Sequence, residues 1–423
     1  MNARMIFGNF IHNRDRNALA FYPQHYLLVE DGLCKGLFPT LPEALRPLPV
    51  DDFGDRLIIP GMTDLHLHAP QFSFRGLGMD MELMDWLDRY TVPEEMRYRD
   101  LDYAARAYGS FVRHLRVSPT TRASVFATVH VPATELLMRL LEDSGLVTFV
   151  GKVNMDRNCP DGLREQSPEA AVAETERWIV ETQSRFPHTK PILTPRFVPS
   201  CSDALLRGLK TLQERYRLPV QSHLSENVGE IQTVRRLCPE SEFYGEAYDR
   251  VGLFGGDHAC IMAHCVHSVD EELELIRQNG VFIAHSPESN MNLASGIAPA
   301  TRYLEMGLNV GLATDVAGGS HESMFRAVMH AIQASKLRWR LLDETVPPLS
   351  LDQAFYLATA GGGAFFGKVG RFEPGFEFDA VVVDDESLDH PQELSLRNRL
   401  ERAMYLADDR NIYAKFVAGA RLF

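Results

Sequence analysis

Short apolar runs recur between residues 57 and 315, and stretches with helical spacing of their apolar residues separate them. Strands that alternate with helices in this way predict a parallel sheet with helical crossovers. We place the strands at residues 57–68, 121–128, 146–156, 190–197, 218–226, 258–265, 281–287 and 309–315. Eight β/α units are the number that closes a TIM-like (β/α)8 barrel, so we expect an α/β fold of that kind.

Two of the intervening helices can be placed in more detail. A helix over residues 168–185 would carry Ala171, Ile179 and Val180, which we assign to one side of it. A second helix over residues 203–216 follows Ser202, whose hydroxyl can cap the first turn.

The two ends of the chain have a different pattern. Residues 1–56 and about 366–423 hold short β-like pieces separated by turns. Neither end is long enough to bury a core alone, so we expect them to pair in one small β-sandwich domain. The predicted division is therefore residues 1–60 plus 366–423 for the sandwich, and residues 61–365 for the barrel.

Composition narrows the class of ligand. The chain has 423 residues, of which 45% are hydrophobic, and a formal net charge of -14. A protein that binds nucleic acid needs clustered Lys and Arg to neutralise phosphates, so we expect no nucleic-acid partner and favour a neutral small molecule. No stretch approaches the ~20 apolar residues that span a bilayer, and residues 1–8 lack the pattern of a signal peptide. Because neither a membrane span nor a signal peptide is indicated, we expect a cytoplasmic protein with no membrane partner.

The six cysteines are scattered along the chain, without a CxxC pair. Neither a thiolate metal site nor a disulfide framework is indicated, and we interpret them as buried apolar thiols.

Two histidines stand at the end of the first predicted strand. His66 and His68 are two residues apart, and on a strand such residues point to the same face. Taken alone, the pair is more often a polar strand end than a metal site. Its interpretation therefore depends on what the other strands carry.

Further polar groups fall at or near the carboxyl ends of other predicted strands, where barrel enzymes keep their active sites. They are Arg196, His223, Glu226, His264 and Asp315. Polar residues at separate strand ends of one barrel would converge on one place, which strongly favours a site over a set of unrelated polar edges.

His66, His68, His223 and Asp315 together offer three imidazoles and one carboxylate. This donor set suits zinc and is tolerable to iron(II). A metal held this way lowers the pKa of a bound water toward neutrality, so the set indicates a hydrolase.

The remaining polar residues suggest roles near such a metal. Glu226 is either a carboxylate at a helix N-terminus or a proton shuttle, and we favour the shuttle. Arg196 is either a structural ion-pair partner or, beside the aromatic Phe197, a donor to a planar heterocycle with a carbonyl group. The side-chain amide of Gln71 is either an ordinary loop group or a hydrogen-bonding partner for the edge of the heterocycle. We expect Trp86 to pack a helix rather than to contact a ligand.

These residues are similar to motifs of the amidohydrolase superfamily and, within it, of the guanine deaminases. The superfamily resemblance rests on residues 60–68, on the single histidines near the fifth and sixth strands, and on Asp315. The narrower resemblance rests on residues 86–95, 151–158, 194–197, 223–227, 314–319 and 405–412.

The resemblance implies a function and a set of roles. It implies hydrolytic deamination of guanine to xanthine and ammonia, with one zinc per subunit on His66, His68, His223 and Asp315. A water activated at the metal would give a proton to Asp315 and attack C2 of the purine, Glu226 would protonate N3, and His264 would orient the attacking oxygen. The residues around the purine would be Gln71, Arg196, Phe197, His223, Glu226, His264 and Asp315. The resemblance also implies a homodimer.

The resemblance indicates how many metals to expect, but it does not fix the substrate. Binuclear members bridge two metals with a modified lysine at the fourth strand, whereas Arg196 stands here, so one metal is expected. His285 stands where the family commonly has Cys or Phe, and it is the best candidate for a residue just behind the site. The alternatives are another aminoheterocycle, such as a pterin, 8-oxoguanine or a triazine, and a non-catalytic barrel that serves as a scaffold.

Overall fold

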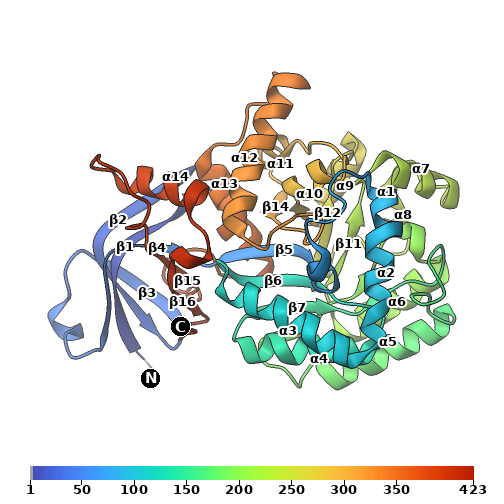
Figure 1. The fold of residues 1–423 in the computed structure, drawn as a ribbon, viewed down its shortest axis with the longest axis horizontal. Coiled ribbons are helices and arrows are strands. Elements are labelled where there is room, and N and C mark those ends of the chain that lie inside the picture. The colour runs from blue at the N-terminus through green and yellow to red at the C-terminus, as the bar shows by residue number, and fades with distance from the viewer. Residues whose placement is uncertain (1–2) are drawn as a thin grey trace.

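The computed structural model describes residues 3–423, which form an α/β barrel and a smaller sheet side by side (Figure 1). The smaller sheet has seven strands in the order β17-β16-β15-β4-β1-β2-β3. Its strands come from both ends of the chain: β1 Ala3–Asp15, β2 Ala18–Glu30, β3 Leu33–Phe38, β4 Val50–Pro60, β15 Ala380–Val383, β16 Ile412–Val417 and β17 Ala420–Arg421.

The smaller sheet folds over on itself. At its β3 edge, the backbone N–H of Cys34 donates to the carbonyl of Phe376 at 2.8 Å, and that of Phe378 donates to Gly32 at 2.8 Å. The β3 edge is thereby held against the segment that leads into β15. The enclosed core is apolar and includes Ile6, Phe10, Leu27, Ile58, Val382 and Phe416.

The barrel is built from parallel strands in two four-stranded sheets, β5-β6-β7-β9 and β11-β12-β13-β14, with a short pair, β8-β10, beside them. Their bounds are β5 Met62–His68, β6 Thr120–Phe126, β7 Val147–Gly151, β8 Val153–Asn154, β9 Thr189–Pro191, β10 Thr194–Pro195, β11 Val220–Leu224, β12 Cys260–His264, β13 Phe282–His285 and β14 Asn309–Leu312. The predicted strands 146–156 and 190–197 are each interrupted.

Backbone hydrogen bonds join the two sheets at both seams. On one side the N–H of Gln221 donates to the carbonyl of Leu193 at 2.9 Å. On the other side the N–H of Asp315 donates to the carbonyl of His66 at 2.9 Å. These bonds complete the ring, and the fold is the predicted (β/α)8 barrel with a small β domain.

The predicted single strand 57–68 is wrong, because the chain passes from one sheet to the other in its middle. The N–H of Gly61 donates to Asp379 of the small sheet at 3.0 Å, whereas that of Met62 donates to Pro119 beside the barrel at 3.0 Å. A Cβ at Gly61 would lie 2.2 Å from Cγ2 of Thr121, so only glycine fits this crossing.

Helices surround the barrel and also occur in the C-terminal segment. Their bounds are α1 Leu83–Trp86, α2 Val92–Glu95, α3 Leu101–Val117, α4 Val131–Ser144, α5 Pro168–Thr182, α6 Asp203–Tyr216, α7 Val228–Leu237, α8 Tyr244–Asp249, α9 Asp270–Asn279, α10 Pro287–Asn292, α11 Ala300–Glu305, α12 Met324–Leu341, α13 Leu351–Tyr356 and α14 Leu396–Leu406. The sequence pattern did not predict α14, which packs on α12 beside the small sheet.

Both detailed helix predictions can be compared with the structure. Helix α6 has the predicted bounds, and Ser202 accepts a hydrogen bond from the N–H of Leu205 at 3.2 Å. On α5, Ala171 and Ile179 are buried, but Val180 is 55% exposed, so its assignment to the same side is wrong. Nine residues separate Ala171 from Val180, and at ~100° per residue they lie on opposite sides of the helix.

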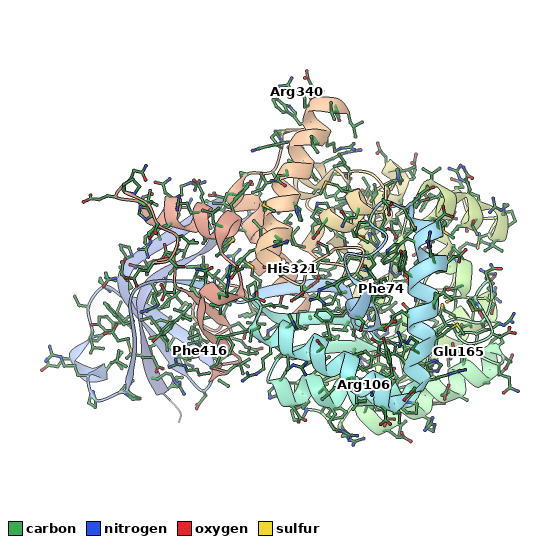
Figure 2. The ribbon with its side chains drawn as sticks, in the orientation of Figure 1. Phe74, Arg106, Glu165, His321, Arg340 and Phe416 are labelled. Carbon is green, nitrogen blue, oxygen red and sulfur yellow. The ribbon has the colours of Figure 1, made fainter. Side chains whose placement is uncertain are left out.

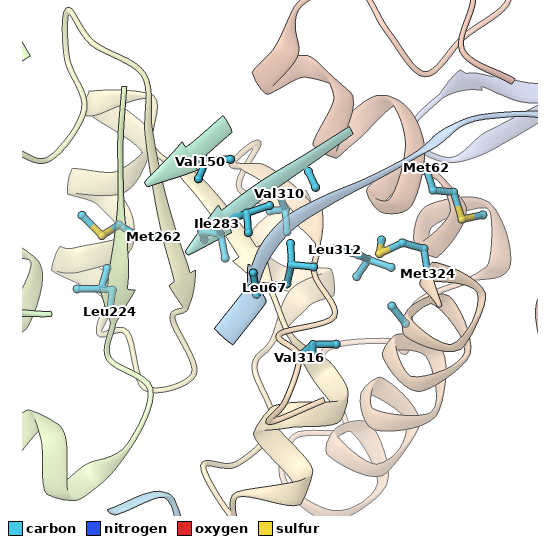
Figure 3. Close-up of a cluster of buried hydrophobic side chains, with 14 of the residues drawn as sticks. Met62, Leu67, Val150, Leu224, Met262, Ile283, Val310, Leu312, Val316 and Met324 are labelled. Atoms are coloured by element: carbon cyan, nitrogen blue, oxygen red, sulfur yellow. The ribbon is translucent and has the colours of Figure 1, made fainter. Parts of the chain in front are cut away.

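The barrel strands turn apolar side chains outward against the helices. Figure 3 shows Leu224, Met262 and Ile283 among the buried side chains of this layer. Residues next to them, such as His223, face the barrel interior, because neighbours on a strand point to opposite sides. Figure 2 shows the side chains of both parts, with Phe416 in the small sheet.

Two expectations from composition can also be compared. Five of the six cysteines are buried, Cys159 is partly buried, and none forms a disulfide. Among residues 3–423, no helix combines the length and the apolar character that crossing a bilayer requires.

Candidate active site

Four predicted metal donors converge at the carboxyl ends of the barrel strands. Nε2 of His66 lies 3.2 Å from Oδ1 of Asp315, and Nε2 of His68 lies 3.5 Å from the same oxygen. Nε2 of His223 lies 3.3 Å from Nε2 of His68. Ligands of a tetrahedral zinc with bonds of about 2.05 Å stand roughly 3.4 Å apart, so these spacings fit such a metal.

The histidines of this cluster are short of hydrogen-bond partners. Among the described residues, neither ring nitrogen of His66 nor Nδ1 of His68 makes a hydrogen bond, although both side chains are buried. A buried polar group without a partner costs about 1–3 kcal/mol, so the cluster is arranged for something that these residues do not supply. Of these unpartnered atoms, Nε2 of His66 faces Asp315, and a metal ion at that point would satisfy it.

The charge states in the cluster also suit a metal. Burial and the neighbouring imidazoles hold the pKa values of His68 and His223 well below the usual range, so both rings are neutral at pH 7. Burial acts to raise the pKa of Asp315, but the imidazoles of His66 and His264 outweigh it and hold this pKa at about 2. Neutral imidazoles and an ionised carboxylate are the forms that coordinate metals.

A backbone carbonyl orients His223. Nδ1 of this ring lies 2.6 Å from the carbonyl oxygen of Arg196. Because a carbonyl can only accept, Nδ1 carries the proton, and Nε2 turns its lone pair toward His68.

His264 and Glu226 stand beside the four donors. Nε2 of His264 lies 3.5 Å from Oε2 of Glu226 and 3.7 Å from Oδ2 of Asp315. His264 and Asp315 both have left-handed backbone conformations, with φ of 74° and 48°. Such conformations cost of order 1–3 kcal/mol in a residue other than glycine and are concentrated at functional sites.

Glu226 is buried, and its burial raises the pKa of the carboxyl group. Its Oε1 accepts a hydrogen bond from the hydroxyl of Ser295 at 3.0 Å. Glu226 precedes α7, whose N-terminal cap is Asn227, so it lies outside the helix. A carboxyl group that is shielded from water and faces an imidazole can hold and pass a proton.

The sequence interpretation missed Glu230, which holds Glu226 in place. Oε2 of Glu230 accepts from the backbone N–H of Glu226 at 3.1 Å, and Oε1 accepts from the hydroxyl of Tyr244 at 2.7 Å. Asn227 and Glu230 have the spacing of a capping box, and that spacing was the available indication.

Arg196 and Gln71 meet at a residue that the sequence interpretation also missed. Oε2 of Glu95 accepts from Nη1 of Arg196 at 2.6 Å, and Oε1 accepts from Nε2 of Gln71 at 3.0 Å. Phe197 follows Arg196, and its ring centroid lies 6.3 Å from that of His223. Glu95 lies in a continuous helical stretch over residues 83–99, in which the π-helical turn Leu87–Thr91 precedes α2 and interrupts the regular period of 3.6 residues.

These groups line one cavity at the mouth of the barrel. Its polar side includes His68, Gln71, Arg196, His223, Glu226, Glu230, His264 and Asp315, and its apolar side includes Leu83, Trp86, Leu87, Phe197 and Leu293. Trp86 packs against Phe74 with ring centroids 5.4 Å apart, as expected, but it also lines the cavity, which was not expected. The cavity can enclose a small planar molecule between apolar walls and the polar cluster.

His285 lies near this cavity without lining it. It is buried at the end of β13, and its Nδ1 has no hydrogen-bond partner among the described residues. Burial lowers the pKa of His285 to about 4, with a further contribution from His264. The ring is therefore neutral at pH 7.

Comparisons with known proteins identify the family of the chain. The model of the amidohydrolase family matches residues 57–422. A guanine deaminase of Homo sapiens is 34% identical in an alignment 446 residues long, and the alignment covers 99% of this chain and 96% of the relative. A crystal structure of guanine deaminase from C. acetobutylicum, with guanine bound in its active site, has 45% identity and a TM-score of 0.97, with 100% of both chains covered.

A more distant structure shares the fold. An adenosine deaminase from Xanthomonas campestris, solved with bound zinc, is 21% identical and has a TM-score of 0.83. The comparison covers 99% of this chain and 92% of that one.

Proposed function

The chain belongs to the amidohydrolase family, and we propose that it hydrolyses guanine to xanthine and ammonia with one zinc ion per subunit. The observation that carries this proposal is the cavity in which three of the four proposed metal donors, His68, His223 and Asp315, lie together with Arg196 and Gln71. The related guanine deaminases support the choice of substrate.

His66, His68, His223 and Asp315 would hold the metal. Their donor spacings and charge states fit zinc, and three nitrogens with one oxygen are a common set for that ion. Zinc held in this way supplies Lewis acidity that makes water nucleophilic near neutral pH. Iron(II) accepts the same donors and is the alternative metal.

Side chains of the protein take up and donate the protons during the reaction. As water attacks C2 of guanine, Asp315 takes the proton that the water loses, and His264, which faces both carboxylates, orients the attacking oxygen. Glu226 gives a proton to N3 of the ring, a role that its raised pKa supports. The proton held by Asp315 then passes to the amino nitrogen, the C2–N bond breaks and ammonia leaves, and the proton of the new C2 hydroxyl returns to Glu226. Guanine and water thereby become xanthine and ammonia.

Other residues that line the cavity would recognise the purine. Arg196 donates to the O6 carbonyl, Gln71 contacts the adjacent edge, and Phe197 and Trp86 provide apolar surface for the ring. Adenine lacks the carbonyl and would leave buried donors without partners, which makes its binding costly.

The proposal is tested by incubating purified, zinc-loaded protein with guanine and measuring ammonia and xanthine. Adenine, a pterin, 8-oxoguanine and a triazine in parallel separate this function from that of related deaminases. Guanine deamination with no comparable turnover of the others is the expected result. Preferred turnover of another ring would replace the substrate, and a protein that binds no metal would indicate a scaffold.

We further propose a cytoplasmic homodimer composed of two-domain subunits, with residues 1–60 plus 366–423 as the small domain and residues 61–365 as the barrel. The seven-stranded sheet supports the division, because it takes its strands from both chain ends. The family resemblance alone supports the dimer, and sedimentation equilibrium of the purified protein tests it.

A further inference from the structure

Glu95 is a buried carboxylate that joins two residues of the cavity wall. Its side chain is buried, with 1% of the residue exposed, and its two oxygens hold different partners. Oε2 accepts from Nη1 of Arg196 and Oε1 accepts from Nε2 of Gln71. Arg196 and Gln71 line the cavity, so Glu95 stands directly behind the pair.

The first consequence concerns the orientation of the Gln71 amide. An ionised carboxylate can only accept hydrogen bonds, so the group of Gln71 that faces Glu95 must be its NH2. The carbonyl oxygen then faces the other way, where it accepts a hydrogen bond from the backbone N–H of Ala317 at 3.4 Å. An amide oxygen has two lone pairs, so Gln71 can still accept from an N–H group of a ligand.

The second consequence concerns the charge of Arg196. The guanidinium has five N–H donors, and Glu95 occupies Nη1, which leaves other donors for a ligand. Because Glu95 neutralises the positive charge, the pair offers donors without a net charge. An uncharged carbonyl group matches such donors, whereas an anionic group would face the carboxylate as well.

We infer that Glu95 is the positioning residue that makes this pocket specific for an uncharged cyclic amide, a ring carbonyl next to a ring N–H. Through Arg196 it sets the donor for the carbonyl, and through Gln71 it sets the acceptor for the N–H. In guanine these groups are O6 and N1–H. The inference rests on the proposed function and adds to it a residue that does not itself touch the substrate.

Glu95→Gln tests the inference, with Glu94→Gln as its matched control. Glu94 is the preceding residue, also largely buried, but it contacts Arg97 and Tyr103 instead of the cavity residues. Glu95→Gln removes the charge and offers an NH2 group where only acceptors stood. We expect the KM for guanine to rise about 10- to 100-fold, since hydrogen bonds to charged groups are involved, with kcat within about threefold.

Two inhibitors separate positioning from a general structural effect. Hypoxanthine has the cyclic amide but no amino group at C2, and unsubstituted purine has neither. In Glu95→Gln we expect the inhibition constant of hypoxanthine to rise about 10- to 100-fold and that of purine to change less than about threefold. Equal losses for both ligands, or the same losses in Glu94→Gln, would overturn the inference.

Further measurements keep the outcomes distinct. Zinc content and thermal unfolding are measured for each variant. If Glu95→Gln does not fold, Glu95→Asp keeps the charge but shortens the reach, and it must then weaken hypoxanthine more than purine. A wild-type protein that does not deaminate guanine would overturn the proposed function and this inference with it. An active wild type whose Glu95 variants bind hypoxanthine normally would overturn the inference alone.

Discussion

The mouth of the barrel and the core of the small sheet are built from opposite kinds of side chain. The mouth gathers buried imidazoles and carboxylates, some without hydrogen-bond partners, on a backbone that is left-handed at His264 and Asp315. The core of the small sheet gathers residues such as Phe10, Val382 and Phe416 between hydrogen-bonded strands. The mouth of the barrel is thus less stable than a packed core would be. The small sheet contributes buried apolar packing, and none of the proposed metal donors belongs to it.

This contrast predicts that substitutions in the two regions will differ in what they change. Variants at the mouth should lose activity or metal with little loss of stability. Variants of the small sheet should lose stability while each folded molecule keeps its activity.

The largest effect is expected for Asp315→Asn. An amide is a poorer metal ligand than a carboxylate and cannot take the water's proton, so kcat/KM for guanine should fall about 10³-fold or more. Kinetics and elemental analysis of zinc measure the two losses. Asp270→Asn, at an exposed side chain on α9, is the control and should match wild type. Retention of both zinc and activity by Asp315→Asn would remove Asp315 from the proposed site.

Glu226→Gln comes next. The amide keeps the size of the side chain but cannot shuttle a proton, so kcat should fall about 10²- to 10⁴-fold while zinc content stays unchanged. Exposed Glu271→Gln serves as the control. A kcat within threefold of wild type would exclude the shuttle role, and loss of zinc would assign Glu226 to metal binding.

Phe416→Leu examines the other region. It removes part of a fully buried ring on β16, so the free energy of unfolding should fall by about 1–2 kcal/mol. Urea denaturation measures this change, and kcat per bound zinc should not change. Tyr413→Leu, on the same strand but 49% exposed, should cost less. A fall in kcat with Phe416→Leu would show that the two regions are not separable.

The smallest effect concerns His12, a buried polar residue in the small domain. Burial, with a contribution from Arg371, lowers the pKa of His12 to about 4. As pH falls below about 6.5, the unfolded chain takes up a proton that the folded protein refuses, so stability falls down to about pH 4. Between pH 6.5 and 5.0 this amounts to less than ~2 kcal/mol.

His12→Phe should flatten this part of the pH dependence. Urea denaturation of wild type and variant at several pH values measures the difference, in which the titration of other groups cancels. Parallel pH profiles would mean that His12 does not resist protonation in the folded protein.

The sequence predicted the features that follow a regular period. The β/α alternation predicted the barrel because each strand must be buried on both faces, and His66, His68, His223 and Asp315 were found because each stands at a strand end. Their coordination of a metal stays a prediction. The ligand atoms of His66, His68 and Asp315 lie within 4.8 Å of one another, and those of His66, His223 and His264 form a second such group.

Features that depend on tertiary contacts were not predicted. Glu95 follows a π-helical turn that interrupts the helical period, and only the fold brings it to Arg196 and Gln71. The break at Gly61 coincides with Pro60-Gly61, a turn signal that the predicted strand 57–68 passed over, and the different partners on its two sides show it. The prediction for Val180 was wrong because its angular position on the helix was misassigned, although the helix itself was correctly placed.

The passage of the chain through Gly61 has a consequence for synthesis on the ribosome. Strand β4 pairs with β1 on one edge and with β15, at residues 380–383, on the other. The edge for β15 therefore stays open until more than 300 further residues have been made, and an open apolar edge invites pairing with other chains. The ribosome must therefore synthesise all the barrel residues before that edge can close, so the exposed edge of β4 is a point of risk for aggregation of the nascent chain.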